Sequence, residues 1–256
     1  RREQSGCRMN ALVNSVLRLV KWPVALASVA ALPGAVLAFR DEIEAVVDAF
    51  EVVGPFLYGA GGYFVLWRLV LRRRLMREGT FWATFEHELT HTVFSLLTFN
   101  PVREFMATGK RGGYMSHGGS ENWLVPVSPY FFPTLSVPVM LIMLVLEGDE
   151  IDVANIVLGV TVAYHITSTY RETRLNYSQK GQKGAHPLGD EVGNDFRMVG
   201  IRFAWCFLPA ANVVSYGLIL GMARNKVDGL RDYSTGLWDH SHDLWLQVEE
   251  LFRSLF

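Results

Sequence analysis

Two histidines and a glutamate occupy one helical turn in the segment His87-Glu88-Leu89-Thr90-His91. His87 and His91 are four positions apart, so on an α-helix their side chains project from the same face. Two imidazoles placed in this way can share one tetrahedral Zn²⁺ ion. Glu88 lies about 100° around the helix from His87, where its carboxylate can act as general base toward a zinc-bound water. The segment therefore predicts zinc-dependent hydrolysis, with Zn²⁺ as the cofactor.

The composition indicates that this motif belongs to a membrane protein. Of the 256 residues, 50% are hydrophobic and 19% are charged, whereas soluble domains contain about 25% charged residues. The net charge is −1 and no stripe of Lys and Arg with interleaved aromatic residues is present, so we do not expect nucleic acid as a partner. The two cysteines, Cys7 and Cys206, form no CxxC pair, which makes a cysteine zinc site or a disulfide scaffold a poor interpretation.

Six apolar runs are long enough to cross a bilayer, for which a helix needs about 20 residues. Several of them contain glycine and proline, which membrane helices tolerate better than soluble helices do. The sequence predicts an all-α polytopic membrane protein of about six hydrophobic helices, with residues 1–223 as one integral membrane metallopeptidase-like domain. The runs lie near residues 17–39, 52–71, 81–100, 124–146, 151–170 and 196–222.

Residues 101–123 interrupt the apolar pattern. Two short segments flank the glycine-rich turn at residues 109–113, which predicts a small membrane-associated β-hairpin between the zinc-motif helix and the next helix. A hairpin at membrane depth is tolerated only where protein or a water-filled cavity satisfies its backbone. A site that must admit water to zinc provides such a cavity.

The C-terminal segment, residues 224–256, is a second exception. Its leucines and aromatic residues recur at helical spacings, which predicts an amphipathic helix. This helix lies on the lipid bilayer, docks on a partner protein, or packs as an ordinary terminal helix. His240 and His242 within it are two positions apart and fall on different helix faces, so we expect them to be solvated.

The distribution of Lys and Arg predicts an orientation in the membrane. The N-terminal segment and residues 68–77 are basic, whereas residues 40–51 are acidic, which places the first two in the cytoplasm. Residues 171–194 are also basic, although six simple crossings would place them outside. A hairpin that re-enters and returns the chain before Leu124 removes this conflict, and we prefer it to the alternative of a miscounted helix. The active site is then expected toward the cytoplasmic side.

A catalytic zinc site needs a third protein ligand in addition to the two histidines. Asp195 begins the last apolar run, where a carboxylate is either a plain helix cap or a functional group. The other candidates for the third ligand are Asp190, His186, His165 and His117.

Further polar residues lie inside or beside the apolar runs. His165 and Thr169 share a helix face with Glu172, where they can hold a metal ligand or the substrate carbonyl in place. A structural hydrogen-bond ladder between helices is the alternative. Asn212 in the last run has the same two interpretations, and His117 in the hairpin either contacts substrate or lies on the surface.

Several motifs, taken in their order along the chain, resemble those of the site-2-protease-like intramembrane zinc metallopeptidases. The resemblance is greatest to a small branch of this family without extra soluble domains, and it covers roughly residues 82–215. The motifs are His87-Glu88-Leu89-Thr90-His91, Gly112-Gly113, Asn122-Trp123-Leu124, Pro129-Tyr130-Phe131-Phe132-Pro133, the stretch from Gly159 to Glu172, and the step from Asp195 to Gly200.

The resemblance implies that an aspartate from a later helix completes the metal site, and Asp195 is the position that fits. Asp195 is followed by Phe196, whereas the family more usually has Asp-Gly. The resemblance also implies that the substrates are single-span membrane proteins or their remnants. We expect an integral protein of the bacterial inner membrane.

The sequence therefore predicts an intramembrane zinc metalloprotease in which His87, His91 and Asp195 bind the metal and Glu88 is the general base. The alternative is a catalytically idle or accessory subunit of a membrane protein complex with the same fold, for which the tail at residues 224–256 would bind a partner. A third interpretation is a membrane zinc hydrolase that acts on a lipid or a small amide.

Overall fold

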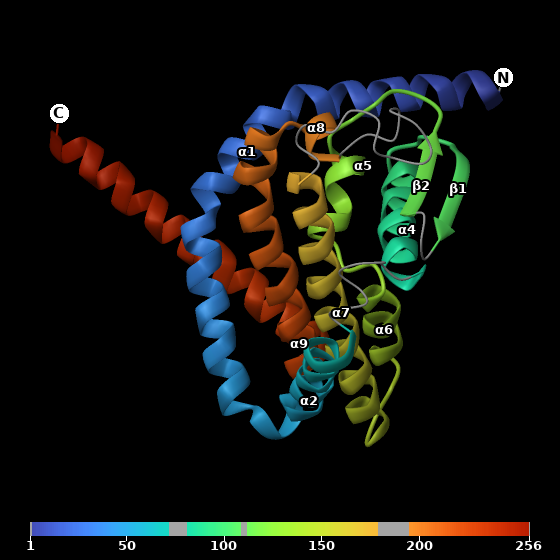
Figure 1. Ribbon diagram of the computed structural model, residues 1–256. Helices are drawn as coiled ribbons and strands as arrows, with labels where there is room; N and C mark the ends of the chain where they lie inside the picture. Colours follow the sequence, from blue (N-terminus) through green and yellow to red (C-terminus); the bar gives the residue numbers. More distant parts are fainter. Residues whose placement is uncertain (1, 72–80, 109–111, 179–194, 256) are drawn as a thin grey trace.

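The computed structural model describes residues 2–71, 81–108, 112–178 and 195–255 (Figure 1). His186 and Asp190, two candidates for the third ligand, lie outside the described residues. Helices make up most of the described chain, and its sheet consists of two antiparallel strands. The predicted combination of a helical bundle with a small hairpin is confirmed.

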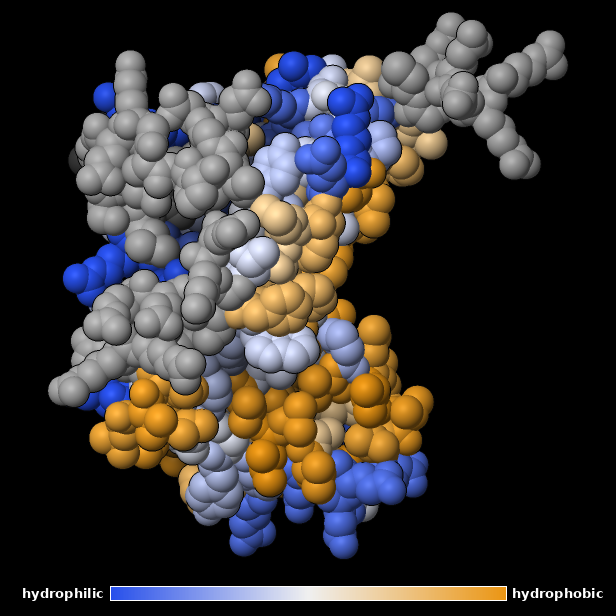
Figure 2. Space-filling model, turned by 45° about the vertical axis from the view of Figure 1, so that its right-hand side comes forward, coloured by the Kyte–Doolittle hydropathy of each residue, from blue (hydrophilic) through white to orange (hydrophobic). Residues whose placement is uncertain are grey.

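Three helices in the described part of the chain are long and apolar enough to cross a membrane. They lie within α1 (Arg2–Asp48), α7 (Glu150–Ser178) and α9 (Ile201–Leu255). Less than half of the most apolar window of each is buried inside the molecule. Figure 2 shows the result on one face, where a belt of hydrophobic side chains lies above a hydrophilic rim. Exposed apolar surface of this extent indicates a membrane protein.

Six membrane-spanning helices are not observed among the described residues. The run at 124–146 is divided into α5 (Leu124–Val127), the 3₁₀ turn η2 (Ser128–Tyr130) and α6 (Ser136–Met143). Its prolines cause the division, because proline has no backbone N–H and its ring clashes with the preceding turn of a helix. These prolines are Pro126, Pro129, Pro133 and Pro138.

Two further predicted spans are not among the three long apolar helices. The run at 52–71 becomes α2 (Phe50–Leu66) followed by the π-helical turn η1 (Trp67–Leu71). The zinc-motif run becomes α4 (Phe81–Leu97), and α2 and α4 have 17 residues each. That length is at the lower limit of what a membrane crossing needs.

The long helices pack as two parallel pairs. The first half of α9 runs beside α1, with an edge-to-face contact of Trp22 and Phe203 at one end and a hydrogen bond from Arg224 to Glu42 at the other. α2 runs beside α7, and the close approach of the two occurs at Gly59 and Gly159. A Cβ atom on either glycine would lie 2.0 Å from a backbone carbonyl oxygen of the opposite helix. The α2–α7 pair therefore depends on the absence of side chains at this crossing.

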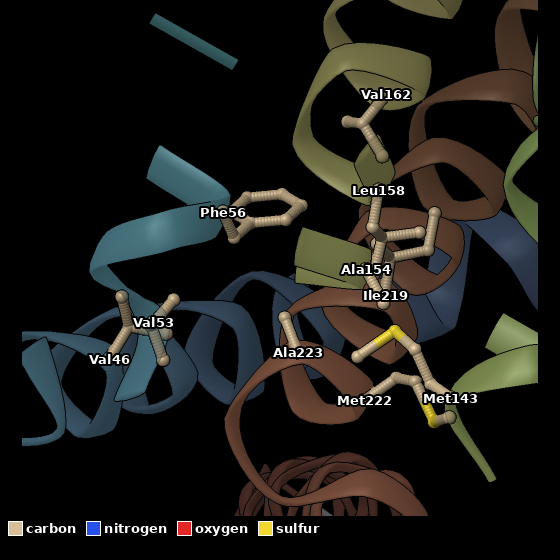
Figure 3. Close-up of a cluster of buried hydrophobic side chains, with 10 residues drawn as sticks. All are labelled: Val46, Val53, Phe56, Met143, Ala154, Leu158, Val162, Ile219, Met222 and Ala223. Atoms are coloured by element: carbon tan, nitrogen blue, oxygen red, sulfur yellow. The ribbon is translucent and has the colours of Figure 1, made fainter. Parts of the chain in front are cut away.

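The largest buried cluster joins α1, α2, α6, α7 and α9. Phe56 of α2 points toward Ala154 and Leu158 of α7, and Met143 of α6 lies beside Met222 of α9 (Figure 3). These helices come from both halves of the chain. The cluster where they meet lies at the end of the bundle that is opposite the hairpin (Figure 1).

α9 reverses direction at Asn225 and Lys226, where the backbone leaves the helical region and Lys226 has a φ of 48°. The segment after this kink folds back, and the hydroxyl of Tyr233 donates to the carbonyl of Val213 at 3.1 Å. His240 lies 2.6 Å from a carboxylate oxygen of Asp41 in a partly exposed pair at the surface, and His242 is exposed. The start of the tail is thus a packed helix, whereas its end projects from the body (Figure 1).

The predicted hairpin is present as β1 (Val102–Thr108) and β2 (Gly112–His117). Its two ends meet at Asn14 of α1, whose side-chain oxygen accepts from Asn100 at 3.2 Å and from Asn122 at 2.6 Å. The chain therefore leaves and returns at the same place. The predicted return of the chain to the cytoplasmic side, like the depth of the hairpin in a membrane, stays a prediction.

We expect Gly59→Ala to lower the free energy of unfolding by about 1–3 kcal/mol, because the added methyl group forces α2 and α7 apart. Gly61→Ala on the same helix is the matched control, since a Cβ atom there meets nothing within 4 Å. Its stability should stay the same or rise by up to about 1 kcal/mol. Thermal unfolding in detergent measures both, and equal stabilities would contradict the proposed role of the crossing.

Candidate metal centre

His87 and His91 of α4 meet Asp195, the first residue of α8 (Asp195–Val199). Among the described residues, these three form the group whose ligand atoms could hold a metal ion, all within 4.8 Å of one another. The Nε2 atoms of the two histidines are 3.1 Å apart. Asp195 lies 3.2 Å from Nε2 of His87 through Oδ2 and 3.6 Å from Nε2 of His91 through Oδ1.

These separations suit a tetrahedral zinc ion. With metal–ligand bonds of 2.0–2.1 Å, two donor atoms at corners of a tetrahedron are about 3.3 Å apart. Two imidazoles and one carboxylate are also a donor set that catalytic zinc sites use, with a fourth position left for water. The residues present therefore fit the predicted cofactor.

The charges of the group also suit a cation. Burial by itself would raise the pKa of Asp195, but His91 and His87, when positively charged, outweigh it and lower this pKa below its usual range. The buried carboxylate is therefore stabilised by positive charge beside it, which a metal ion would supply while both imidazoles stay neutral.

His91 is oriented by a backbone carbonyl on the other side of the centre. Its Nδ1 lies 2.8 Å from the carbonyl oxygen of Val125 in α5. An N–H at Nδ1 that donates to this oxygen leaves Nε2 unprotonated and directed at Asp195. Fixing the tautomer of a histidine in this way is a usual accompaniment of metal binding.

Tyr130 in η2 is a residue of the centre to which sequence analysis assigned no role. Its hydroxyl donates to Oδ2 of Asp195 at 2.7 Å, and its ring meets the ring of His87 edge to face at a centroid distance of 5.5 Å. In the sequence, Tyr130 is marked only by its place between Pro129 and Pro133, which predicts a fixed turn but not which residues the turn contacts.

Asn212 and Thr169, which were predicted to support the site, form hydrogen bonds with the backbone of η2. Asn212 of α9 donates to the carbonyl of Tyr130 at 3.0 Å, and the hydroxyl of Thr169 of α7 is 3.4 Å from the carbonyl oxygen of Pro129. The turn that carries Tyr130 is thus attached to two of the long helices.

Glu88 is 7% exposed and lies under the hairpin. A Cβ atom on Gly113 of β2 would be 2.5 Å from its carboxylate oxygen Oε1. The hairpin backbone therefore passes directly over Glu88, the predicted general base, and a glycine at position 113 allows this approach. His117, also in β2, does not belong to the metal group, and its Nδ1 lies 3.4 Å from the carbonyl oxygen of Gly118.

His165 does not contact the metal ligands but pairs with Glu86, a residue that sequence analysis missed. Nδ1 of His165 is 3.5 Å from Oε1 of Glu86, and their side chains are 2% and 3% exposed. The other carboxylate oxygen of Glu86 is buried without a hydrogen-bond partner. This contact attaches the start of α4 to α7 one residue before His87. The signal was a second carboxylate in the motif helix, on the face away from Glu88.

No protein-family model, curated protein or solved structure matches the chain.

We expect His165→Leu to lower the free energy of unfolding by about 1–3 kcal/mol, because Glu86 loses its imidazole partner while it stays buried. The double variant Glu86→Met/His165→Leu should regain most of this loss, since an apolar pair leaves no unpaired carboxylate. Denaturation of the metal-free proteins in detergent provides the comparison. A double variant that is less stable than the single variant would show that His165 and Glu86 stabilise the fold by more than pairing with each other.

Proposed function

We propose that the protein is a zinc-dependent metallopeptidase that cleaves peptide bonds of membrane-spanning proteins. The observation that supports this most directly is the spacing of the donor atoms of His87, His91 and Asp195, with Glu88 on the same helix as the two histidines. The resemblance to site-2-protease-like metallopeptidases agrees with this arrangement.

Zinc bound by the three residues would polarise the scissile carbonyl and lower the pKa of a bound water toward about 7. Glu88 takes the proton from the water and passes it to the leaving amine. Its burial beneath the hairpin keeps bulk water away from this transfer. The orientation of His91 by Val125 keeps the ligand nitrogen unprotonated.

The hairpin is the proposed place of substrate binding. Each of its two strands has one edge that is unpaired within the sheet, and an extended peptide can add its main-chain hydrogen bonds to such an edge. A helical substrate would have to unwind first, because its peptide groups are already hydrogen-bonded and hidden from the attacking water.

We place the centre toward the cytoplasmic side of a bacterial inner membrane. α2 and α7 run in parallel, as the contact of Tyr63 with Tyr164 shows, so Arg68 and Arg171 leave the bundle at the same end. Thr169 contacts η2 at this end, beside the metal centre. Gathering of basic residues at one end agrees with the positive-inside tendency.

A second candidate function is that of an accessory subunit of a membrane complex. It is favoured by the end of α9, which projects from the body and exposes large apolar side chains, including Trp238 at 70% and Trp245 at 65%. Aromatic residues displayed on one helix are typical of partner-binding surfaces.

Purified protein should contain about one zinc ion per chain, and His87→Ala or Asp195→Ala should lose most of it, because two remaining ligands hold zinc weakly. His242→Ala is the matched control, since this exposed histidine lies on the tail. Metal analysis by mass spectrometry measures the content. Absence of zinc from wild-type protein that has been purified with zinc present would contradict the proposed metal site.

Glu88→Gln should retain zinc but abolish cleavage, with a loss of at least about a hundredfold, because the general base is removed while the ligands stay. The membrane proteome of cells carrying this variant should accumulate one uncut single-span protein. Glu121→Gln, at an exposed position, is the control. An unchanged proteome together with loss of a membrane complex on deletion of residues 242–255 would support the accessory subunit instead.

A further inference from the structure

We propose that Tyr130 is a positioning residue that makes Asp195 bind the metal through one oxygen only. This inference rests on the proposed function, because it concerns the ligands of that metal site. Tyr130 itself does not bind the metal in this proposal and acts through the carboxylate.

The phenol of Tyr130 is held in one place. Tyr130 is 1% exposed, and its ring contacts that of His87, at a centroid distance of 5.5 Å, and that of Phe196, at 4.6 Å. Close packing in this buried position restricts the rotamers of the side chain, so the hydroxyl stays directed at Oδ2 of Asp195.

The backbone of Tyr130 is fixed as well. Its carbonyl accepts from Asn212 of α9, and the carbonyl of the preceding Pro129 accepts from Thr169 of α7. The hydroxyl therefore cannot follow Asp195 if the carboxylate turns, and it restrains the carboxylate instead.

This restraint determines how many positions around the metal are filled. A carboxylate can bind a cation through one oxygen or through both. Oδ2 already accepts the hydrogen bond from Tyr130, which makes it the weaker donor toward a metal. Asp195 bound through one oxygen leaves the fourth position for water, which hydrolysis requires, whereas binding through both oxygens would fill it. Tyr130 thereby separates a catalytic arrangement from a closed, structural one.

Cobalt binding to the full-length protein in detergent tests the proposal without relying on activity. We expect Tyr130→Phe to bind Co²⁺ about 10- to 100-fold more weakly. The visible spectrum of its bound Co²⁺ should differ from that of wild type, because the bands of cobalt depend on the identity and geometry of its ligands and a second carboxylate oxygen takes the place of water. Tyr233→Phe is the matched control, since it also removes a buried hydroxyl, one that donates to Val213. It should leave both quantities unchanged.

The outcomes separate the two proposals. Wild-type protein that binds no Co²⁺ would overturn the proposed function. Wild type that binds Co²⁺, together with a Tyr130→Phe variant of equal affinity and equal spectrum, would overturn the role of Tyr130 and leave the metal site intact.

If Tyr130→Phe does not fold, 3-fluorotyrosine at position 130 retains the ring and the hydroxyl. Its fluorine resonance should shift when Zn²⁺ is added, because the acceptor of the hydroxyl becomes a metal-bound carboxylate. The same label in His87→Ala should not shift. A resonance that is unchanged by Zn²⁺ in the otherwise wild-type protein would overturn the proposal.

Discussion

The arrangement of the metal centre depends on one missing backbone N–H. In a regular helix the N–H of residue 129 would donate to the carbonyl of Val125, but proline at 129 has none. The carbonyl of Val125 accepts instead from His91, from the hydroxyl of Ser128 and, in the tighter pattern of a 3₁₀ turn, from the backbone N–H of Ser128. The same interruption creates the turn that carries Tyr130 to Asp195. One proline thus frees an acceptor for one ligand and positions a donor for another.

Local sequence was sufficient to predict the part of this centre that lies within one helical turn. The spacing of His87 and His91 determines that they share a face, whereas the place of Asp195 at the start of an apolar run indicated only a carboxylate at a helix end and left other third ligands open. The identities of Glu86 and Tyr130 as interacting residues could not be predicted in this way, because their partners are 79 and 65 residues away. Such contacts follow from packing, which a hydropathy pattern does not describe.

The run at 124–146 differs from the predicted span for a related reason. Many membrane helices tolerate single prolines, but four prolines within 13 residues leave too few backbone donors for a continuous helix. The hairpin could be predicted because its glycine-rich turn is a local signal, and the structure confirms its two strands. Which side of a membrane the chain reaches after the hairpin depends on charge alone and stays a prediction.

Attachment of both hairpin ends to Asn14 has a mechanical consequence. The base of the hairpin is fastened to α1 by buried amide hydrogen bonds, whereas beyond this base the strands rest on α4 through contacts such as that of Phe105 with Phe85. Displacement of the strands from α4 would break apolar contacts but leave the amide hydrogen bonds at the base in place. The first helix of the chain, distant in sequence from the zinc motif, thus holds the segment that passes over Glu88.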